Sequence, residues 1–389
     1  MPKDPGILDT CLFMEAIAGD GGAHDPLTGT WWLSPDVQLT SNGGVADVAD
    51  KNKSNNITVR VHKKASCALP GGSTVLVDVY VGNPSLAMAP GSISTKLVAT
   101  PLLSAASLAG GVATVTAPWT PTGSGTDADS PGHRCLIARC SRDTGDTPDA
   151  AAFHVEDQHY CQHNITIVET ANDGMVAMKI MTGNPDRAGL GGMKIQVLED
   201  IKPATSLVRL ITPSMKASKS FKEFASTQSR NFAVNMTKFE RSFGSVIKTG
   251  PALNQIIRPG VRFDRILNEG VEPTAVLRPG QPLKAVITRG TNIATVVNPN
   301  VDKAIVTGGA VQAVAVNSNL KVGANGRFGT LAKPNLQVAL NTKPGFFSTF
   351  DFNADVAKSK PGTAHVFHLS QVGNDKRPHG GLTVIVVRR

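Results

Sequence analysis

Alternating apolar and polar positions dominate this chain. In STVLVDVYV (73–81), Val75, Val77, Val79 and Val81 fall on one face of an extended strand, because successive strand side chains point to opposite sides. Similar runs bounded by Gly, Pro, Asn or Asp include NITVRVHKKAS (56–66), MVAMKIMTGNP (175–185), AHVFHLSQV (364–372) and GLTVIVVRR (381–389). Short alternating runs between turn-forming residues predict an all-β protein.

Helical periodicity is scarce in the sequence. The best helical candidate is residues 218–243, where Phe221, Phe224 and Ala225 recur at the spacing of one helix face. Its Asn and Thr residues are weak helix formers. We therefore expect little helix beside the strands.

Chain length and an internal repeat indicate more than one domain. A chain of 389 residues is longer than one ordinary domain. Gly-Asn-Pro follows a strand-like run twice, with Gly82 and Gly183 separated by 101 residues, the size of one immunoglobulin-like sandwich. Glycine suits a turn with positive φ and proline ends a strand, so the two turns are expected to be equivalent.

Four segments carry a resemblance to a known family through their order along the chain. They are WWLSPDVQLT (31–40), NITVRVHKKASCALPGGSTVLVDVYVGNPS (56–85), GHRCLIARC (132–140) and QHNITIV (162–168). Together they resemble the first domain of bacterial tandem immunoglobulin-like proteins of the cell-adhesion-related, CARDB-like type. The resemblance implies a seven-stranded antiparallel sandwich that serves as a spacer, scaffold or adhesion module. No catalytic residues come with it.

The predicted organisation has three parts. They are an N-terminal extension at 1–27, an immunoglobulin-like sandwich at 28–170, and a second β-sandwich region at 171–389 with an inserted or third domain at about 200–345. Residues 175–200 resemble the opening of a second such domain and residues 361–389 its closing hairpin. The predicted fold class is all-β: two or three tandem immunoglobulin-like antiparallel β-sandwiches with little helix.

Charge is spread unevenly over the chain, whose formal net charge is +9. Residues 1–150 carry 10 Lys and Arg against 14 Asp and Glu, whereas residues 151–389 carry 29 against 16. The net charge is thus −4 on residues 1–150 and +13 on residues 151–389. Parts of opposite charge favour contact between subunits, in a homo-oligomer or with partner proteins of a particle. Nucleic acid is a poor partner, since 3 Trp and 2 Tyr offer few rings for base stacking. No apolar run reaches the roughly 18 residues of a membrane-spanning helix.

Histidine and cysteine gather near residue 160. In a strand, His159, Cys161 and His163 share one face, and His133 and Cys135 share a face of the preceding strand. If these faces coincide, the five residues form a nitrogen and sulfur ligand set, which zinc prefers in structural sites. The alternatives are a disulfide between Cys135 and Cys161, and buried thiols with histidines at the sandwich rim. Five cysteines leave at least one without a partner in the chain.

Other candidate chemistry is sparse. His365 and His368 are three residues apart, so they fall on opposite faces of a strand and are not expected to bind one ligand together. No G-x-S-x-G, H-E-x-x-H or EF-hand pattern occurs. Trp31 and Trp32 are either a sugar-binding platform or core residues. The sequence therefore predicts a protein that is not an enzyme.

The expected function is structural or adhesive, in a bacterial surface structure or a phage or tail-like particle. The alternatives are a module that binds carbohydrate or another surface ligand, and a metal-dependent hydrolase built on the His/Cys residues. A structural or adhesive function of this kind favours an extracellular or particle-associated protein. Asp4 and Asp9 stand where a signal peptide has basic residues, so we expect no classical signal peptide.

Overall fold

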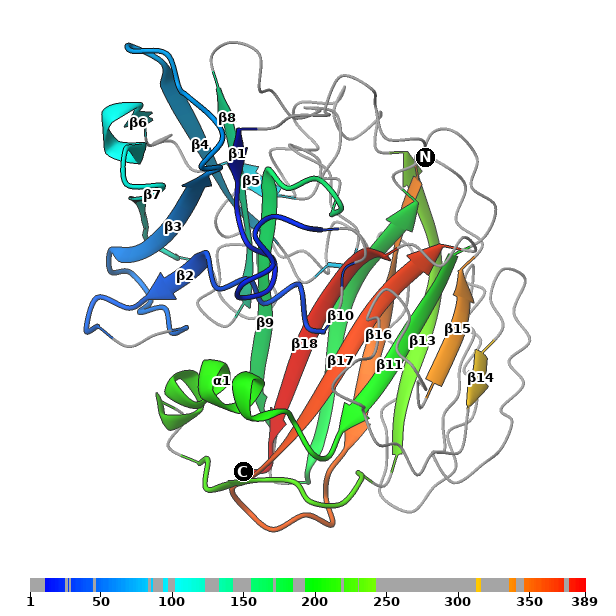
Figure 1. The fold of residues 1–389 in the computed structure, drawn as a ribbon. Helices are drawn as coiled ribbons and strands as arrows, with labels where there is room; N and C mark the ends of the chain where they lie inside the picture. Colours follow the sequence, from blue (N-terminus) through cyan, green and yellow to red (C-terminus); the bar gives the residue numbers. More distant parts are fainter. Residues whose placement is uncertain are drawn as a thin grey trace.

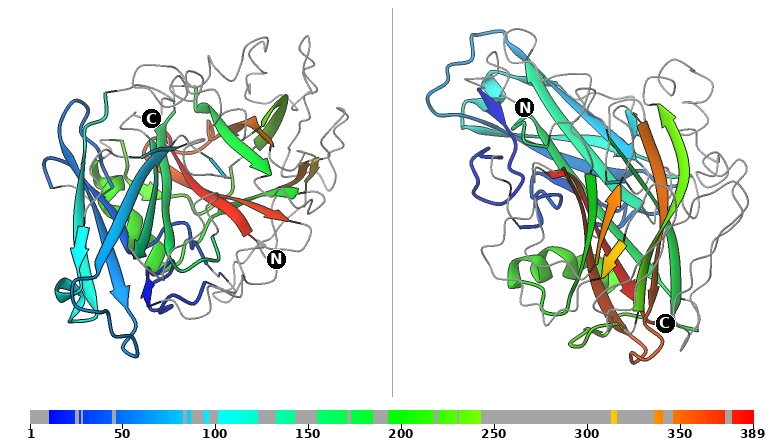
Figure 2. Two further views of the ribbon diagram at one scale, coloured as in Figure 1. Left: turned by 90° about the horizontal axis from the view of Figure 1, so that it is seen from above. Right: turned by 90° about the vertical axis from the view of Figure 1, so that its right-hand side faces the viewer.

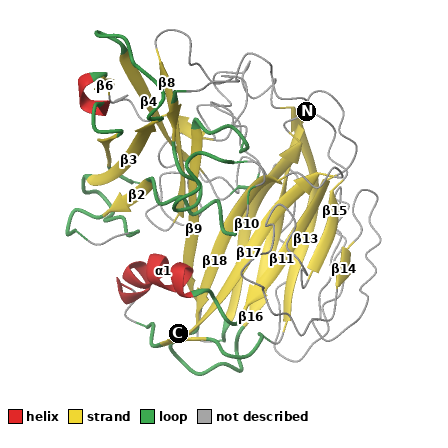
Figure 3. Cartoon of the chain, viewed as in Figure 1, coloured by secondary structure: helices red, strands yellow, loops and turns green. Residues whose placement is uncertain are grey.

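Strands make up most of the computed structural model of this protein (Figure 1, Figure 3). The structure describes residues 11–24, 27, 29–44, 47–82, 85–86, 94–96, 102–122, 133–142, 155–170, 173–184, 193–217, 220–229, 231–242, 313–315, 336–340, 346–373 and 378–389. Within these ranges there is one α-helix, α1 (Thr205–Ala217), and one short 3-10 helix, η2 (Ala106–Leu108). The predicted all-β fold class is confirmed.

The first sandwich packs a four-stranded sheet on one half of a much longer sheet. The small sheet is built on β3 (Asn55–Lys63), which pairs antiparallel with β1 (Leu12–Phe13), β2 (Val37–Thr40) and β7 (Val112–Trp119). The facing strands are β4 (Thr74–Gly82), β5 (Ser94–Lys96), β6 (Leu102–Ser104), β8 (His133–Arg142) and β9 (Tyr160–Glu169). Val59 and Val115 of one layer lie in the same apolar core as Val77 of the other. The predicted apolar face of β4 is thus confirmed.

The second sandwich has the same design. Its three-stranded sheet has β16 (Phe346–Asp355) between β10 (Met175–Asn184) and β13 (Asn231–Ser242). The facing strands are β11 (Met193–Asp200), β12 (Glu223–Phe224), β14 (Ala313–Ala315), β15 (Leu336–Leu340), β17 (Thr363–Gly373) and β18 (Pro378–Val387). Phe367 of β17 meets Phe232 and Phe352 of the other sheet, with ring centroids 5.5 and 5.1 Å apart. These aromatic contacts close the second core.

One continuous sheet joins the two sandwiches. β9 pairs in parallel with β18, with Ile165 opposite Thr383, and so links the halves into an 11-stranded sheet (Figure 1). The predicted boundary at 170–171 falls between β9 and β10, but backbone hydrogen bonds between β9 and β18 connect the parts on either side. Two further views show that the strands of the two halves run in different directions (Figure 2). Such a difference is expected from the twist of a long sheet.

Trp32 connects the N-terminal segment to β18 through a hydrogen bond and close packing. Its indole Nε1 donates a hydrogen bond to Thr383 Oγ1 at 2.9 Å, and Asn164 Nδ2 donates to the Gly381 carbonyl at 3.0 Å. A Cβ on Gly381 would lie 2.0 Å from the Trp32 ring, so glycine permits this close approach. Trp31 is also buried. Both rings are therefore core residues, which confirms the second of the two alternatives and excludes a sugar platform on these rings.

The predicted helix at 218–243 is wrong. Residues 223–224 form β12 and residues 231–242 form β13, while the helix lies earlier, at α1. Phe224 lies in β12, which pairs with β17, and Phe232 and Val234 are buried alternate residues of β13, which pairs with β16. These strand pairings override the helical spacing of Phe221 and Phe224. α1 packs Leu207, Ile211 and Met215 into the same apolar cluster as the outer face of β17 and β18.

The region at about 200–345 is described only in part. Its β13 belongs to the three-stranded sheet, and β14 and β15 belong to the long sheet. The helix α1 and strand β12 also lie in this region, and its residues 243–312, 316–335 and 341–345 lie outside the described residues, as does the N-terminal extension before residue 11. The third domain stays a prediction.

Candidate functional site

The five predicted metal-ligating residues do not share a face. β8 and β9 pair antiparallel as expected, with Cys135 opposite Asn164 and Cys161 opposite Ala138. Directly opposed residues point to the same side, so Cys135 faces away from the side that Cys161 and His163 occupy. His133 is opposite Thr166 and falls on the Cys135 side by register; its side chain is not among those described. The prediction that these five residues converge is therefore wrong, because convergence needs a β8–β9 register one residue away from the register that the structure has.

The histidines of β9 and its approach have separate partners. His159 Nδ1 lies 2.7 Å from Asp157 Oδ1. His163 Nε2 lies 2.9 Å from Asp47 Oδ1, and its Nδ1 lies 3.2 Å from the Ser34 carbonyl oxygen. Each ring is buried against oxygen atoms of its own neighbours, so His159 and His163 lie in separate polar contacts inside the first sandwich.

The disulfide joins other cysteines than predicted. Cys11 and Cys67 are bonded, with Cα atoms 5.5 Å apart, and they connect the start of β1 to the segment after β3. Cys135, Cys140 and Cys161 are free and buried, so the alternative of a Cys135–Cys161 bond is wrong. Burial raises the pKa of Cys135 to about 12 and raises that of Cys161 well above its ordinary value. The third alternative considered from the sequence, buried thiols, is the one that the cysteines of β8 and β9 match.

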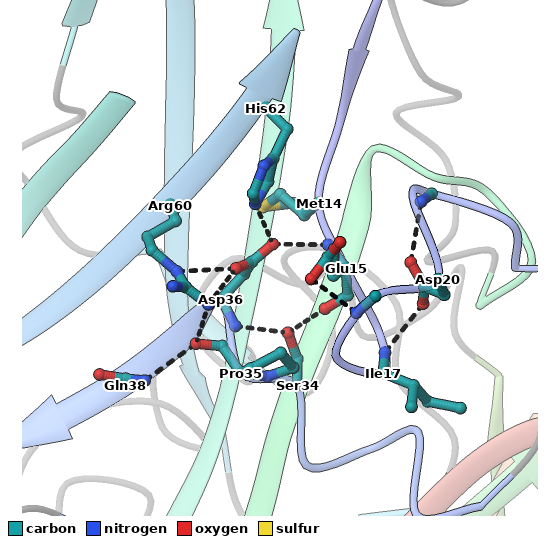
Figure 4. Close-up of polar contacts among 12 residues, drawn as sticks. Met14, Glu15, Ile17, Asp20, Ser34, Pro35, Asp36, Gln38, Arg60 and His62 are labelled. Carbon is teal, nitrogen blue, oxygen red and sulfur yellow. Dashed lines mark hydrogen bonds and ion pairs between the residues drawn. The ribbon is translucent and has the colours of Figure 1, made fainter. Parts of the chain in front are cut away.

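A buried carboxylate, Asp36, lies at the middle of a polar centre in the first sandwich (Figure 4). Arg60 Nε donates to Asp36 Oδ1 at 2.9 Å, and the Glu15 backbone N–H donates to Oδ2 at 2.6 Å. His62 Nε2 lies 2.9 Å from the same Oδ2. Because Arg60 and His62 are two residues apart on β3, their side chains reach Asp36 from one face of that strand. Ser34 Oγ donates to the Glu15 carbonyl and accepts from the Asp36 N–H.

The Asp36 centre has metal-ligand atoms but a closed set of partners. One ligand atom each from Glu15, Asp36 and His62 lies within 4.8 Å of the others. The Arg60 guanidinium, however, lies 2.8 Å from Asp36 and neutralises it, and a cation beside that guanidinium would be repelled. The residues fit an internal ion pair better than a metal site. Sequence reasoning missed this centre because Asp36 and Arg60 are 24 residues apart.

A second polar centre lies where β11, β17 and the β16–β17 loop meet. His365 Nδ1 lies 2.7 Å from Glu199 Oε1, and His365 Nε2 lies 2.7 Å from Ser359 Oγ. His368 faces the other side of β17, where its Nε2 lies 3.4 Å from Asp200 Oδ2. The expectation that His365 and His368 would point to opposite faces is confirmed. The Glu199 and Ser359 partners were not visible in sequence, since 166 residues separate Glu199 from His365.

Comparison with known proteins yields distant structural neighbours. No protein-family model matches the chain, and no curated protein matches it in sequence. The chain is similar to the collagen adhesin CNA from S. aureus (9% identity, 91% of this chain and 93% of that chain, TM-score 0.21) and to the C-terminal domain of the Streptococcus agalactiae AgI/II polypeptide BspA (7%, 90% and 99%, TM-score 0.21). A third neighbour is a mutant of the CFA/I adhesin CfaE from enterotoxigenic E. coli (8%, 90% and 87%, TM-score 0.18). These scores are too low to indicate a shared topology or function.

The CARDB-like resemblance stays a prediction, because none of these neighbours is of that type. Among the described residues, no helix combines the length and the apolar character needed to cross a membrane.

Proposed function

We propose that this chain is a structural and adhesive β-sandwich protein that assembles with further copies of itself, in a bacterial surface structure or a phage or tail-like particle. The observation that carries the proposal is an exposed apolar pair at a sheet edge. Leu102 of β6 is 61% exposed, and its cross-strand partner Leu76 of β4 is 37% exposed. Apolar side chains gathered at an edge are typical of a surface that another chain covers.

The backbone of β6 suits strand addition. Among the described residues, β6 pairs only with β4, so its outer edge can accept a further strand. An added strand would gain backbone hydrogen bonds and would cover Leu102. Proteins that stay monomeric commonly protect such edges with charge or proline, and β6 (Leu-Leu-Ser) contains neither.

Charge and redox chemistry support the same proposal. The net charges of −4 on residues 1–150 and +13 on residues 151–389 favour contact between unlike halves of two copies. The Cys11–Cys67 disulfide is typical of proteins that work in oxidising surroundings, such as the outside of a cell. Both features suit an extracellular or particle-associated assembly.

The other functions considered from the sequence gain no support. A carbohydrate-binding module would need exposed aromatic rings, and Trp31 and Trp32 are buried. A hydrolase built on the predicted zinc ligands would need them on one face, and the β8–β9 register separates Cys135 from Cys161.

Light scattering coupled to size exclusion tests the proposal. The wild-type chain is expected to form an oligomer at low salt that weakens as salt screens the opposite charges. Leu102→Lys is expected to weaken self-association at least about tenfold, because it places a charge where the second copy would pack. Gln38→Lys, which adds the same charge at an exposed position of β2, is the matched control and should leave association unchanged. A wild-type chain that stays monomeric at low salt and high concentration contradicts the proposal.

A further inference from the structure

We propose that Ser359 is a nucleophile activated by His365 and Glu199, so that the chain carries a serine acyl-transfer site in addition to its structural role. These three residues are called the Ser359 site below. The inference goes beyond the proposed function and does not rest on it. What carries it is one juxtaposition: hydroxyl, imidazole and carboxylate in series, with both connecting distances at 2.7 Å.

The order of the three groups is that of an activated serine. Ser359 Oγ lies against His365 Nε2, and His365 Nδ1 lies against Glu199 Oε1. A base hydrogen-bonded to the hydroxyl and oriented by a third group is the recurring geometry of serine nucleophiles, on folds that are otherwise unrelated. The three residues come from β11, β17 and the loop between β16 and β17, so the fold assembles them from separate segments.

The partners also fix where the imidazole proton lies. An ionised carboxylate can only accept hydrogen bonds, so beside an ionised Glu199 it is His365 Nδ1 that donates in this contact. The neutral ring then presents the lone pair of Nε2 to Ser359, whose hydroxyl becomes the donor. This is the tautomer in which His365 can take the serine proton.

Glu199 is held rigidly, which is what a positioning residue requires. The Ser229 backbone N–H lies 2.7 and 2.9 Å from the two carboxylate oxygens, and Ser229 Oγ donates to Oε2 at 2.9 Å. Glu199 and His365 are both buried, with His365 stacked against Phe367 at a centroid distance of 6.5 Å. The base and its orienting carboxylate are therefore preorganised away from solvent.

Access distinguishes Ser359 from a similar arrangement on the opposite face of β17. There, Thr383 Oγ1 lies 3.1 Å from His368 Nδ1, and His368 Nε2 lies 3.4 Å from Asp200. Thr383 is fully buried and accepts the hydrogen bond of Trp32, so no substrate can reach its hydroxyl. Ser359 is half-buried in a surface loop. The Thr383–His368–Asp200 arrangement therefore has a similar order of groups but no access for a substrate, whereas Ser359 is partly exposed.

The surroundings of Ser359 favour an anionic acyl substrate. Lys358 and Lys360 flank it in sequence and are both exposed. Lys222 lies nearby, because a Cβ added to Gly362 of the same loop would meet the Lys222 side chain at 2.7 Å. Two lysines next to Ser359 in sequence and a third against Gly362 make this loop locally positive, which would attract an ester that carries a carboxylate or another negative group.

The reaction balances with water as the only co-reactant. Ser359 Oγ bonds to the ester carbonyl carbon while its proton passes to His365 Nε2. The carbon–oxygen bond to the alcohol then breaks, and the alcohol leaves with that proton. Water hydrolyses the acyl-serine, with His365 taking the proton from water and returning it to Ser359, which releases the carboxylic acid.

Labelling with an alkyl fluorophosphonate tests the nucleophile on the full chain. Attack on phosphorus forms a Ser359 Oγ–P bond and breaks the P–F bond, and fluoride leaves. Intact mass and peptide mapping are expected to show one label, on Ser359. Ser359→Ala should abolish it, and His365→Gln should slow it by about 10²-fold or more, the usual contribution of a general base. The exposed pair Ser104 and Ser107, whose hydroxyls bond each other and the Ser107 backbone N–H with no histidine beside them in the described hydrogen bonds, should stay unlabelled.

Folding must be separated from reactivity. Melting curves of each variant identify those that fold, and Glu199→Asp should restore part of the labelling rate lost in Glu199→Gln. If the His365 and Glu199 variants fail to fold, Ser359→Cys serves instead. Its introduced thiol should react with iodoacetamide at neutral pH faster than glutathione does, because His365 can take its proton.

The assigned substrate charge has its own measurement. The p-nitrophenyl half-ester of succinate, which is anionic, should acylate Ser359 faster than p-nitrophenyl acetate, and equal rates would remove the charge preference. No label on Ser359 in the folded wild-type chain, or equal labelling rates in wild type and a folded His365→Gln, would overturn the nucleophile. Self-association is unaffected by either result, so the proposed function stands or falls separately.

Discussion

Asp36 shows how one residue can hold two distant segments together. Its carboxylate is buried and meets Arg60, His62 and the Glu15 backbone, so it connects the approach to β2 with β3 and the N-terminal segment. A buried carboxylate is stable only while its partners remain, since removing one of a pair leaves an uncompensated charge. The Asp36 centre therefore stabilises the fold only while Asp36 and its partners are all present.

Asp36→Asn is expected to lower the free energy of unfolding by about 2–3 kcal/mol. The usual loss on breaking a buried ion pair is about 3–5 kcal/mol, and it is smaller here because the Arg60 side chain is 42% exposed and can turn to water. Urea denaturation measures the change. Gln38→Ala, on the exposed side of β2, should stay within about 0.5 kcal/mol of wild type. A loss of less than that for Asp36→Asn would mean that the carboxylate is not paired.

At the scale of elements, β8 and β9 carry three thiols that the fold keeps unreactive. Cys135, Cys140 and Cys161 are buried, and burial raises the pKa of Cys135 from its ordinary value of 9.0 to about 12. Thiolates, not thiols, react with disulfide reagents. The native chain should therefore expose no reactive thiol at pH 8.

A thiol titration with Ellman's reagent checks this expectation. No thiol per native chain and three per chain in denaturant without reductant are expected, because Cys11 and Cys67 are bonded. Five thiols in denaturant would show that the disulfide is absent. The pH dependence has a definite sign: since the folded pKa of Cys135 is raised, its stabilising contribution is complete below pH 9 and is lost as pH rises from 9 to about 12.

The strands could be predicted because their pattern is local, whereas register is not. Alternation in Val75 to Val81 identified the buried face of β4 without any knowledge of its partner. Pairing Cys135 with Asn164 depends on how the loop between β8 and β9 closes, and a shift of one residue moves every side chain to the other face. The same limit explains the helix error, since the partner of β13 is β16, more than 100 residues later in the chain.

At the scale of the whole molecule, the sequence indicates two sandwiches but not the sheet that unites them. The β9–β18 pairing and the Trp32–Thr383 hydrogen bond join residues that no local pattern connects, the latter 351 residues apart. The Ser359 site has the same origin, because β11 and β17 meet only in the folded sheet. Sequence alone could supply the types of residue, and the topology supplied their arrangement.

A shared sheet predicts shared unfolding. Because backbone hydrogen bonds continue from β9 into β18, the two sandwiches should melt in one transition, with equal calorimetric and van't Hoff enthalpies. Gly381→Val, whose side chain would collide with Trp32, is expected to loosen the connection and split the transition. Ala177→Val, at an exposed position of β10 away from the connection, is the control. Two transitions in the wild-type chain would mean that the halves are independent despite the sheet.

The Trp32–Thr383 connection also has a consequence for synthesis. At about 5–20 residues per second, a ribosome makes Thr383 roughly 20 to 70 seconds after Trp32. During that interval the indole and the open side of β9 lack their native cover, and a nascent chain in this state is prone to aggregate or to pair with a neighbouring nascent chain. The first sandwich must therefore wait for β18 before its fold is complete.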